Sequence, residues 1–489
     1  MRNPYCRTKA ANCAANPWPL SADVLDSSWV APVTPNAKTS RKYRKTNPVS
    51  KSEQVIIIGG GLAGCEAAWQ LLRRGHAVHL YEMKPQKFSP AHKMENLAEL
   101  VCSNSFKSNS PDNAHGLIKE EMRRLHSLII SAADSTAVAA GSALAVDRLL
   151  FAREVETQLN QQKNFTLHRT EITKIPEEVL TIIATGPLTS DSLAQEIARM
   201  LNSSYLYFYD AIAPIVEADS INMNKVFLAS RYDKGTPDYL NCPLSEEEYK
   251  RFHQALLSGE KVLAKAFEDI KHFEGCLPVE VLAARGENTL AFGPMKPVGL
   301  IDPHSGVIPY AVVQLRRENS SGTLFNMVGF QTKLTWPEQQ RIFRLIPGLE
   351  NAGFARYGSI HRNTYVNSPC LLAPSLQLKN NENIFLAGQI TGVEGYTEST
   401  AMGLLAGLNA AFIVEGKKLQ PPPAQTAIGA LLRYITSAES ADHFQPMNIN
   451  FGLLDTSHGK KLKKRDRNIL YVSHALRSLN DWTTAQCLN

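Results

Sequence analysis

One cysteine stands in polar surroundings where a thiol could take part in chemistry. Cys102 lies in the run Glu99-Leu-Val-Cys-Ser-Asn-Ser-Phe-Lys-Ser108. Cysteine is among the most buried residue types, so one flanked by turn-forming residues and a lysine is either incidental or placed where its sulfur can react. From this run alone, a packed structural cysteine is the more frequent case.

The cysteine spacing gives no sign of a metal or disulfide site. The chain has eight cysteines, at positions 6, 13, 65, 102, 242, 276, 370 and 487. They are far apart, without a CxxC pair or a paired Cys/His spacing. This pattern argues against a zinc ribbon, a dithiol redox centre and a secreted disulfide framework, and it favours a reducing compartment. We therefore expect no metal site and a cytoplasmic location.

A glycine-rich loop has the spacing of a dinucleotide-binding turn. The motif Gly59-x-Gly61-x-x-Gly64 follows the apolar run Val55-Ile-Ile-Ile58 and opens a stretch with helical apolar spacing. The first glycine permits a tight turn, the second lets the backbone approach a pyrophosphate, and the third lets the helix pack on the strand. The first helical turn then directs its N–H groups toward the phosphates. The predicted binding residues of this loop are Gly59, Gly60, Gly61, Leu62, Ala63 and Gly64.

Two further features indicate which dinucleotide the loop binds. Glu82 ends the next expected strand, where its carboxylate can accept ribose hydroxyl hydrogen bonds from an adenosine half. Residues 387–407 run from a strand through a glycine loop, containing Gly388 and Gly395, into a small-residue helix whose N-terminus can cover a flavin. A plain NAD enzyme has no need of this return segment, so the pattern predicts FAD. The sequence has no second GxGxxG of comparable quality, so we expect NADPH or NADH to act as a transient reductant.

The elements that position these residues predict an α/β fold. Residues 55–58 are expected to form a buried strand, 62–74 a helix that stops at Gly75, and 78–81 a second strand. Together they make a βαβ unit, which predicts a Rossmann-like FAD-binding domain. Later strands are expected at 180–184 and 383–387, each followed by a glycine-containing turn.

The pattern becomes less regular in the middle of the chain, where a charged helix is expected near residues 246–268. An inserted smaller α+β domain is the simplest account. The expected regions are a disordered extension at 1–53, the first part of the FAD-binding domain at 54–211, the inserted domain at 212–345, and the return segment with a basic C-terminal region at 346–480.

The formal net charge of +6 is located in the first residues of the chain. Residues 1–54 hold nine Lys/Arg and three Asp/Glu, which leaves the rest neutral. Their composition permits an organelle-targeting segment, and a misassigned start codon is an equal alternative. Because the rest of the chain is neutral, any binding of nucleic acid must come from a local patch of positive charge. The candidate is the run Lys460-Lys-Leu-Lys-Lys-Arg-Asp-Arg467. The alternative is that this run is simply the solvent-exposed face of a helix. The sequence has no run of about 18 uncharged apolar residues, so no membrane span is expected.

Several motifs taken together resemble the folate- and FAD-dependent tRNA (uracil-5-)-methyltransferases of the TrmFO family. The resemblance is carried by residues 59–68, 100–107, 239–243, 292–298, 361–365, 388–396 and 445–454. It implies that 5,10-methylenetetrahydrofolate gives its one-carbon unit to the T-loop uridine at tRNA position 54, with NAD(P)H supplying reducing equivalents through FAD. The product is 5-methyluridine. The implied partners are tRNA, through its T-arm, and the folate and nicotinamide co-substrates, without a membrane.

Cys102 and Cys242 match the two cysteines that the resemblance implicates in catalysis. Thiolate addition at C6 of uracil makes C5 nucleophilic, so that C5 can attack an electrophilic methylene; the adduct then loses the C5 proton and expels the thiolate. We assign Cys242 as the nucleophile and Cys102 as a thiol near flavin and base, and this division of roles is a hypothesis. Lys107 can lower a thiol pKa or touch phosphate, although a solvated lysine is the more frequent case.

Other polar groups of these motifs can line the same site. His361, Arg362 and Asn363 offer groups for a flavin ring or a tRNA backbone, and a structural turn is the alternative. Glu394, Tyr396 and Glu398 can line a flavin pocket.

Three other functions compete with this prediction. A GidA-type flavoprotein acting at the wobble uridine shares the glycine loop, but the longer C-terminal helical region expected there is missing. A flavin disulfide reductase needs a closely spaced cysteine pair. A flavin-bearing RNA-binding protein without catalysis is compatible with the residues.

Overall fold

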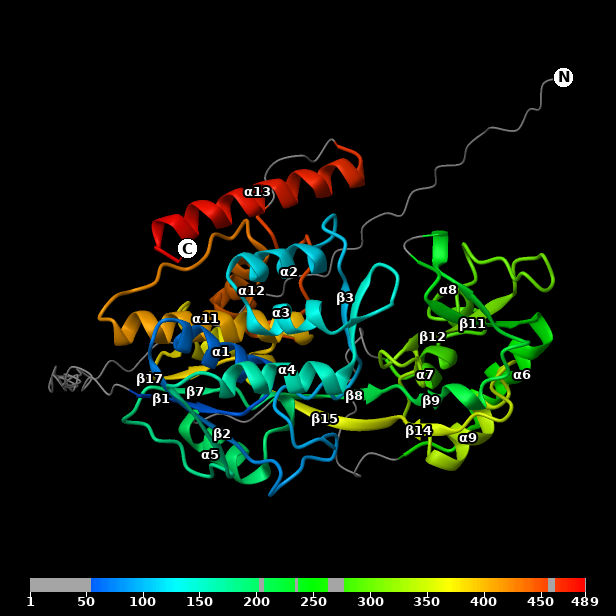
Figure 1. Cartoon of the computed structure of the whole chain (residues 1–489), viewed down its shortest axis with the longest axis horizontal. Helices are drawn as coiled ribbons and strands as arrows, with labels where there is room; N and C mark the ends of the chain where they lie inside the picture. The colour runs from blue at the N-terminus through cyan, green and yellow to red at the C-terminus, as the bar shows by residue number, and fades with distance from the viewer. Residues whose placement is uncertain (1–53, 202–205, 234–235, 263–276, 456–461, 489) are drawn as a thin grey trace, which may run out of the picture. The chain divides into compact units, whose positions relative to one another are not determined.

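The computed structural model describes residues 54–201, 206–233, 236–262, 277–455 and 462–488. The expected extension at 1–53 lies outside these residues. The first sheet has the order β16-β17-β7-β1-β2-β6, and its pairs are parallel except β16 with β17 (Figure 1). Its strands are β1 Gln54–Ile58, β2 Ala77–Glu82, β6 Phe165–Arg169, β7 Thr181–Ile183, β16 Gln377–Leu378 and β17 Asn381–Leu386.

The predicted βαβ unit is confirmed. The chain passes from β1 through α1 (Leu62–Arg73) to β2, which lies parallel to β1 in the register Val55 to Val78. The helix ends beside Gly75, whose φ of +83° is readily adopted by glycine. The strands predicted at 180–184 and 383–387 are β7 and β17, and both are central in the sheet. The predicted α/β fold is therefore confirmed.

Helices cover this sheet and build the larger apolar core. They are α1, α2 Ala114–Arg124, α3 Leu128–Ser135, α4 Arg148–Asn160, α5 Asp191–Leu201, α10 Ser368–Leu371, α11 Tyr396–Val414, α12 Ala427–Thr436 and α13 Lys464–Ala485. The long helix α11 packs closely on α1 because two of its glycines face the α1 backbone. A Cβ at Gly407 would lie 2.6 Å from the carbonyl oxygen of Ala67, and one at Gly403 would overlap the backbone of Ala63.

Helix α11 is also the one described helix that is long and apolar enough to cross a membrane. Its first turn carries Glu398, and 16 of its 19 residues are buried inside the protein. Such burial is typical of the core helix of a folded domain, so its apolar composition is explained by packing on α1.

A second sheet occupies the region of the expected insertion. Its order is β10-β11-β12-β13-β9-β14, with the described pairs antiparallel. The strands are β9 Ile215–Glu217, β10 Phe227–Ala229, β11 Tyr239–Leu244, β12 Ala311–Arg317, β13 Leu324–Met327 and β14 Phe354–Arg356. The helices α6 Glu246–Ser258, α7 Val279–Ala284, α8 Thr289–Phe292 and α9 Trp336–Phe343 accompany it. A separate apolar cluster fills this region, which supports an inserted domain, whose boundaries remain a proposal.

The charged helix of this region is shorter than predicted. It begins as α6 with a capping box, in which Ser245 and Glu248 satisfy each other's backbone N–H groups, and it ends at Ser258 instead of near residue 268. At Gly259 a Cβ would lie 2.7 Å from Ile342 and 2.8 Å from Leu334. These close approaches leave no room for a side chain at residue 259, directly after the helix. Residues 263–276 lie outside the described part of the chain.

Two small sheets complete the fold. The ribbon of β8 (Leu206–Ile212) and β15 (Ser359–Tyr365) runs between the two large sheets in Figure 1. The other small sheet has the order β3-β5-β4, with β3 Ser105–Ser108, β4 Ala137–Val138 and β5 Ala143–Val146. Strand β3 directly follows Cys102, so this small sheet fixes one end of the segment that carries the cysteine.

Candidate active site

The glycine loop borders a cavity of about 80 Å³ at the carboxyl end of β1, named here the loop cavity. Its lining includes Gly59, Gly61 and Glu82 from the βαβ unit. The opposite wall comes from the segment after β7, with Ala184, Thr185, Leu188, Thr189 and Ser190. In open parallel sheets, ligands bind outside the carboxyl ends of the strands, which is where this cavity lies.

The glycines of the loop are required by close backbone approaches. A Cβ at Gly59, whose φ is +105°, would lie 2.6 Å from the carbonyl oxygen of Ala184, and one at Gly64 would overlap the carbonyl of Gly59. Gly60 is equally confined, because its Cβ would lie 2.5 Å from Leu97. Gly61 differs, since an added Cβ there would meet no atom within 4 Å. The loop therefore leaves open space at the residue expected to approach a pyrophosphate.

Glu82 lies where the sequence predicts, and it also stabilises the loop. Its Oε2 accepts the N–H of Gly60 at 2.9 Å, and its Oε1 accepts the N–H of Lys84 at 3.0 Å. A carboxylate offers about four acceptor positions, so each oxygen retains one for a ribose hydroxyl. Leu62 and Ala63 are buried in the first turn of α1, where they support the loop through packing.

A second cavity, of about 260 Å³, is named here the cysteine cavity because Cys102 lines it. Lys107, Gly395, Tyr396 and Asn448 line it together with Arg316, Asn326 and Gly329 from the second sheet. Leu188 belongs to both cavities. Gly388 has a φ of +80°, and its Cβ would lie 2.7 Å from that of Ala63, so this glycine brings the return segment onto α1.

Buried arginines hold the segment that carries Cys102. Arg356 donates from Nη1 to the carbonyl of Val101 and from Nη2 to that of Cys102, each at 3.1 Å. Arg148 donates to Leu100 and, at 3.4 Å, to Cys102, and it is paired with Glu318. Burial lowers the pKa of Arg356 to about 10, so the group remains cationic at neutral pH. Nearby cations of this kind favour a thiolate over a thiol.

Tyr396 and Arg316 also hold the Cys102 segment, and they come from different parts of the fold. The hydroxyl oxygen of Tyr396, at the start of α11, accepts the N–H groups of Cys102 at 2.8 Å and of Ser103 at 3.1 Å. Burial, followed by the neighbouring Cys102, raises the pKa of Tyr396, so the phenol keeps its proton. From the second sheet, Arg316 donates to the Ser103 hydroxyl at 2.8 Å and to Asn104 at 3.1 Å. Helices α4 and α11 and the second sheet therefore all contribute to the position of one cysteine.

The structure does not bring the second predicted catalytic cysteine to this cavity. Cys242 lies on β11, opposite Val313 of β12, and its exposed fraction is 0%. It belongs to the apolar cluster of the second sheet, and burial raises the pKa of its thiol. In this arrangement a substrate cannot reach Cys242, so its position does not support the nucleophile assignment. Leu240, Cys242 and Leu244 stand at alternate positions of β11 and all belong to this cluster, so residue 242 lies on the core side of the sheet.

The other polar predictions are divided between the cavity and its surroundings. Lys107 lines the cysteine cavity and donates to Asn448, and Glu394 lines it beside Gln389, which donates to it at 2.7 Å. Glu398 is buried behind the cavity, where its Oε1 accepts the N–H of Ile449 at 3.1 Å. Burial raises the pKa of Glu398, but the Lys107 charge and the contact with His115 together outweigh burial, so that the net pKa is lowered.

Of the predicted His361-Arg362-Asn363 group, Asn363 lines the cysteine cavity, and the side chains of His361 and Arg362 lie outside the described part. The arginines around Cys102 were missed by the sequence prediction. Arg316 interrupts an apolar strand, Ala311-Val-Val-Gln-Leu-Arg316, and a charged residue in such a strand is a signal of a buried polar contact. Arg148 and Arg356 carry no comparable signal.

These residues fit an FAD molecule. The open backbone at Gly61 and the first turn of α1, which no side chain caps among the described residues, would hold the pyrophosphate. Glu82 would hold the adenosine ribose, and the cysteine cavity would hold the flavin end near Gly395. FAD supplies two-electron redox chemistry when bound.

Fold and site together define a flavoprotein of the GidA type. The family model described as "Glucose inhibited division protein A" matches residues 54–418. The structure of GidA from Aquifex aeolicus (form II crystal) superposes with a TM-score of 0.61 at 17% identity, covering 87% of this chain and 73% of that chain.

The sequence relatives narrow the class. "Methylenetetrahydrofolate--tRNA-(uracil-5-)-methyltransferase TrmFO" of Syntrophus aciditrophicus (strain SB) is 62% identical over 89% of this chain and 98% of that protein. The protein of the same name from Geobacter sulfurreducens is 59% identical over 88% of this chain and 98% of its own length. The chain belongs to the TrmFO family.

Proposed function

We propose that this protein transfers a one-carbon unit from 5,10-methylenetetrahydrofolate to the uridine at position 54 of tRNA, forming 5-methyluridine with FAD as cofactor and NAD(P)H as reductant. The relatives named TrmFO support the substrate and the donor. The observation that carries the proposal is Cys102, held by residues of α4, α11 and the second sheet in the cavity that adjoins the loop cavity through Leu188. We also propose a cytoplasmic location, which the cysteine spacing supports.

We assign Cys102 as the thiol that adds to the base, in place of Cys242. Its sulfur would form a bond to C6 of uracil, so that C5 becomes nucleophilic and bonds to the methylene carbon. Loss of the C5 proton then breaks the bond from sulfur to C6 and releases the thiolate. The bond between this carbon and the folate nitrogen then breaks, tetrahydrofolate leaves, and two electrons and a proton reduce the carbon to a methyl group. FAD, when bound, would supply these electrons from NAD(P)H.

The chain's own residues orient this chemistry. Arg148 and Arg356 hold the carbonyl of Cys102, and their positive charges favour the thiolate. The Tyr396 oxygen accepts the backbone N–H of Cys102 and so fixes this residue. Because the oxygen acts there as an acceptor, the phenolic proton stays available for donation to a group in the cavity. The side chain of Lys107 reaches the same cavity and adds a cation at its wall.

The decisive experiment is a methyl-transfer assay with unmodified tRNA transcript, NADPH and methylene-labelled 5,10-methylenetetrahydrofolate. We expect label in 5-methyluridine, and no label with a transcript that has cytidine at position 54. Label at the wobble uridine would instead identify a GidA-type modification. A flavin-bearing protein that binds tRNA but transfers no label would be the non-catalytic alternative.

Cysteine variants test the assignment within the same assay. Cys102→Ala is expected to abolish label while flavin stays bound, whereas Cys370→Ala, at an exposed cysteine of α10, serves as the matched control. Loss of label in Cys242→Ala with retained fold and flavin, together with activity in Cys102→Ala, would refute the assignment of Cys102.

A further inference from the structure

The beginning of α13 carries a concentration of positive charge that the proposed catalytic step does not use. Lys463, Lys464, Arg465 and Arg467, named here the basic turn, lie at the N-cap and in the first turn of this helix. The first three are exposed and Arg467 is partly exposed. Lys460 and Lys461, which continue the run in the sequence, lie outside the described residues. An ordinary solvent-exposed helix face, the alternative considered for this run, would carry charges of both signs. Asp466 is the single acidic residue between Lys463 and Arg467.

Among the described residues, no carboxylate lies within salt-bridge distance of the cations of the basic turn. The neighbouring helix α2, by contrast, pairs two of its arginines with acids. Arg123 contacts Asp134 at 2.7 Å and Arg124 contacts Glu120 at 3.0 Å. Positive charges near a helix N-terminus are also unfavourable because the helix dipole is positive there. The basic turn therefore carries repulsion that an anionic partner would relieve.

The basic turn lies close to the cysteine cavity. Asn468, one residue after Arg467, donates to the carbonyl of Asp112 at 3.1 Å. Asp112 follows Lys107, a residue of the cavity wall, by five positions in the chain. Five residues span at most about 18 Å when fully extended. In Figure 1 the segment between β3 and α2 reaches the first turns of α13.

From these observations we propose that the basic turn binds the phosphate backbone of the tRNA whose uridine enters the cysteine cavity. This inference rests on the proposed function. A nucleic-acid duplex presents a phosphate charge about every 1.7 Å of its axis, so several phosphates beside the target base lie within reach of the turn. Recognition of paired RNA relies mainly on shape and on backbone contacts. The basic turn contributes binding affinity and positions the tRNA relative to the cysteine cavity, and the cavity selects the base.

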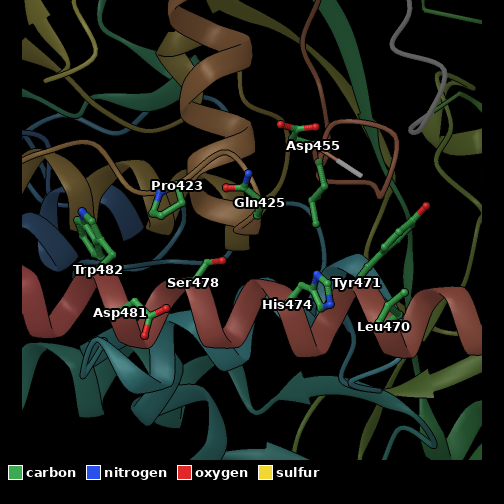
Figure 2. Close-up of a pocket in the computed structure, with 10 residues that line it drawn as sticks. Pro423, Gln425, Asp455, Leu470, Tyr471, His474, Ser478, Asp481 and Trp482 are labelled. Atoms are coloured by element: carbon green, nitrogen blue, oxygen red, sulfur yellow. The ribbon is translucent and has the colours of Figure 1, made fainter. Parts of the chain in front are cut away.

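The groove beside the basic turn limits the direction in which the RNA runs. Figure 2 shows Tyr471, His474 and Asp481 of α13 along a groove of about 550 Å³, whose other wall carries Asp455. Asp455 and Asp481 are acidic and repel phosphate. The RNA backbone is therefore expected to contact the N-terminal end of α13 and to avoid the groove that continues toward the C-terminal end.

The test measures tRNA binding by the full chain as a function of salt. In the variant Lys464→Gln/Arg465→Gln/Arg467→Gln, loss of three phosphate contacts reduces the slope of log affinity against log salt by about 2 to 3. Between 50 and 200 mM salt, wild type would then lose about 20- to 40-fold more affinity than the variant. Removing cations from this turn relieves the dipole repulsion, so thermal stability should not fall.

Two matched variants separate location from total charge. Lys163→Gln/Lys174→Gln/Lys418→Gln removes the same charge from exposed lysines elsewhere, and it is expected to retain the wild-type salt slope. Lys464→Arg/Arg465→Lys/Arg467→Lys keeps the charge of the turn and is expected to bind as wild type does.

The outcomes distinguish this inference from the proposed function. If wild type neither binds nor methylates tRNA, the proposed function fails. If wild type methylates tRNA, and the basic-turn variant keeps both the affinity and the salt slope of wild type, the assignment of the basic turn is overturned while the function stands. An equal loss of slope in the control variant would likewise overturn it, because the effect would then come from total charge.

Discussion

The two hydrogen bonds of Arg356 give a sharp test of how the second sheet controls Cys102. The planar guanidinium of Arg356 reaches two carbonyls at once, those of Val101 and Cys102. A lysine ammonium at residue 356 keeps the charge but cannot reproduce the planar fork. The Cys102 carbonyl retains Arg148 as a donor at 3.4 Å, so Arg356→Lys leaves mainly the Val101 carbonyl without its partner.

The cost follows from the lost hydrogen bond. A hydrogen bond to a charged group contributes about 1.5–3 kcal/mol, and leaving a buried carbonyl unsatisfied costs a similar amount. We take about 2 kcal/mol as the local loss, which corresponds to about 30-fold in kcat/KM if the ordered segment is required in the transition state. Flavin binding should not change, because Arg356 lines neither the loop cavity nor the cysteine cavity.

The assay combines methyl transfer with alkylation of Cys102 followed by mass spectrometry, with exposed Cys370 as internal reference. Arg344→Lys is the matched control, because Arg344 donates twice to the Ala352 carbonyl, at 2.9 and 3.3 Å, and does not contact the Cys102 segment. We expect Arg356→Lys to lower kcat/KM and change the alkylation rate of Cys102. The reasoning is refuted if kcat/KM and the Cys102 alkylation rate of Arg356→Lys both stay within about twofold of wild type. It is also refuted if Arg344→Lys loses as much kcat/KM as Arg356→Lys does.

Three further predictions concern the cofactor loop and the core. Gly61→Ala should fold with unchanged thermal stability, since its Cβ meets no atom within 4 Å, but should lack the flavin absorbance that is expected for wild type. Gly403→Val should lower the free energy of unfolding by about 1–3 kcal/mol in denaturant titration, because it forces α11 away from Ala63. Burial raises the pKa of Glu121 to about 7, so the folded state binds a proton more tightly and stability should decrease as pH rises from about 4.5 to 7. Glu121→Gln should remove this pH dependence, measured by thermal unfolding across that range.

Local sequence patterns determined the first sheet and its cofactor loop. The alternation of apolar runs with glycine turns is a short-range signal, and the βαβ unit from β1 to β2 follows from it together with the handedness of the connection. Gly59, Gly61 and Gly64 are predictable from their spacing after β1, although the closest neighbour of Gly59, the Ala184 carbonyl, comes from the distant segment after β7. The return segment with Gly388 and Gly395 was predictable because it repeats the order of strand, glycine loop and helix.

Tertiary structure decided which residues surround the reactive cysteine. The resemblance implicated both Cys102 and Cys242, and Cys242 was predicted to be the nucleophile. Pairing of β11 with β12 buries Cys242, whereas Arg148, Arg316 and Arg356 converge on the Cys102 segment from distant parts of the chain. Burial and long-range hydrogen bonds depend on strand register and on the packing of the two sheets, which local periodicity does not specify. The sequence therefore determined the cofactor fold, and packing determined which thiol faces the cavity.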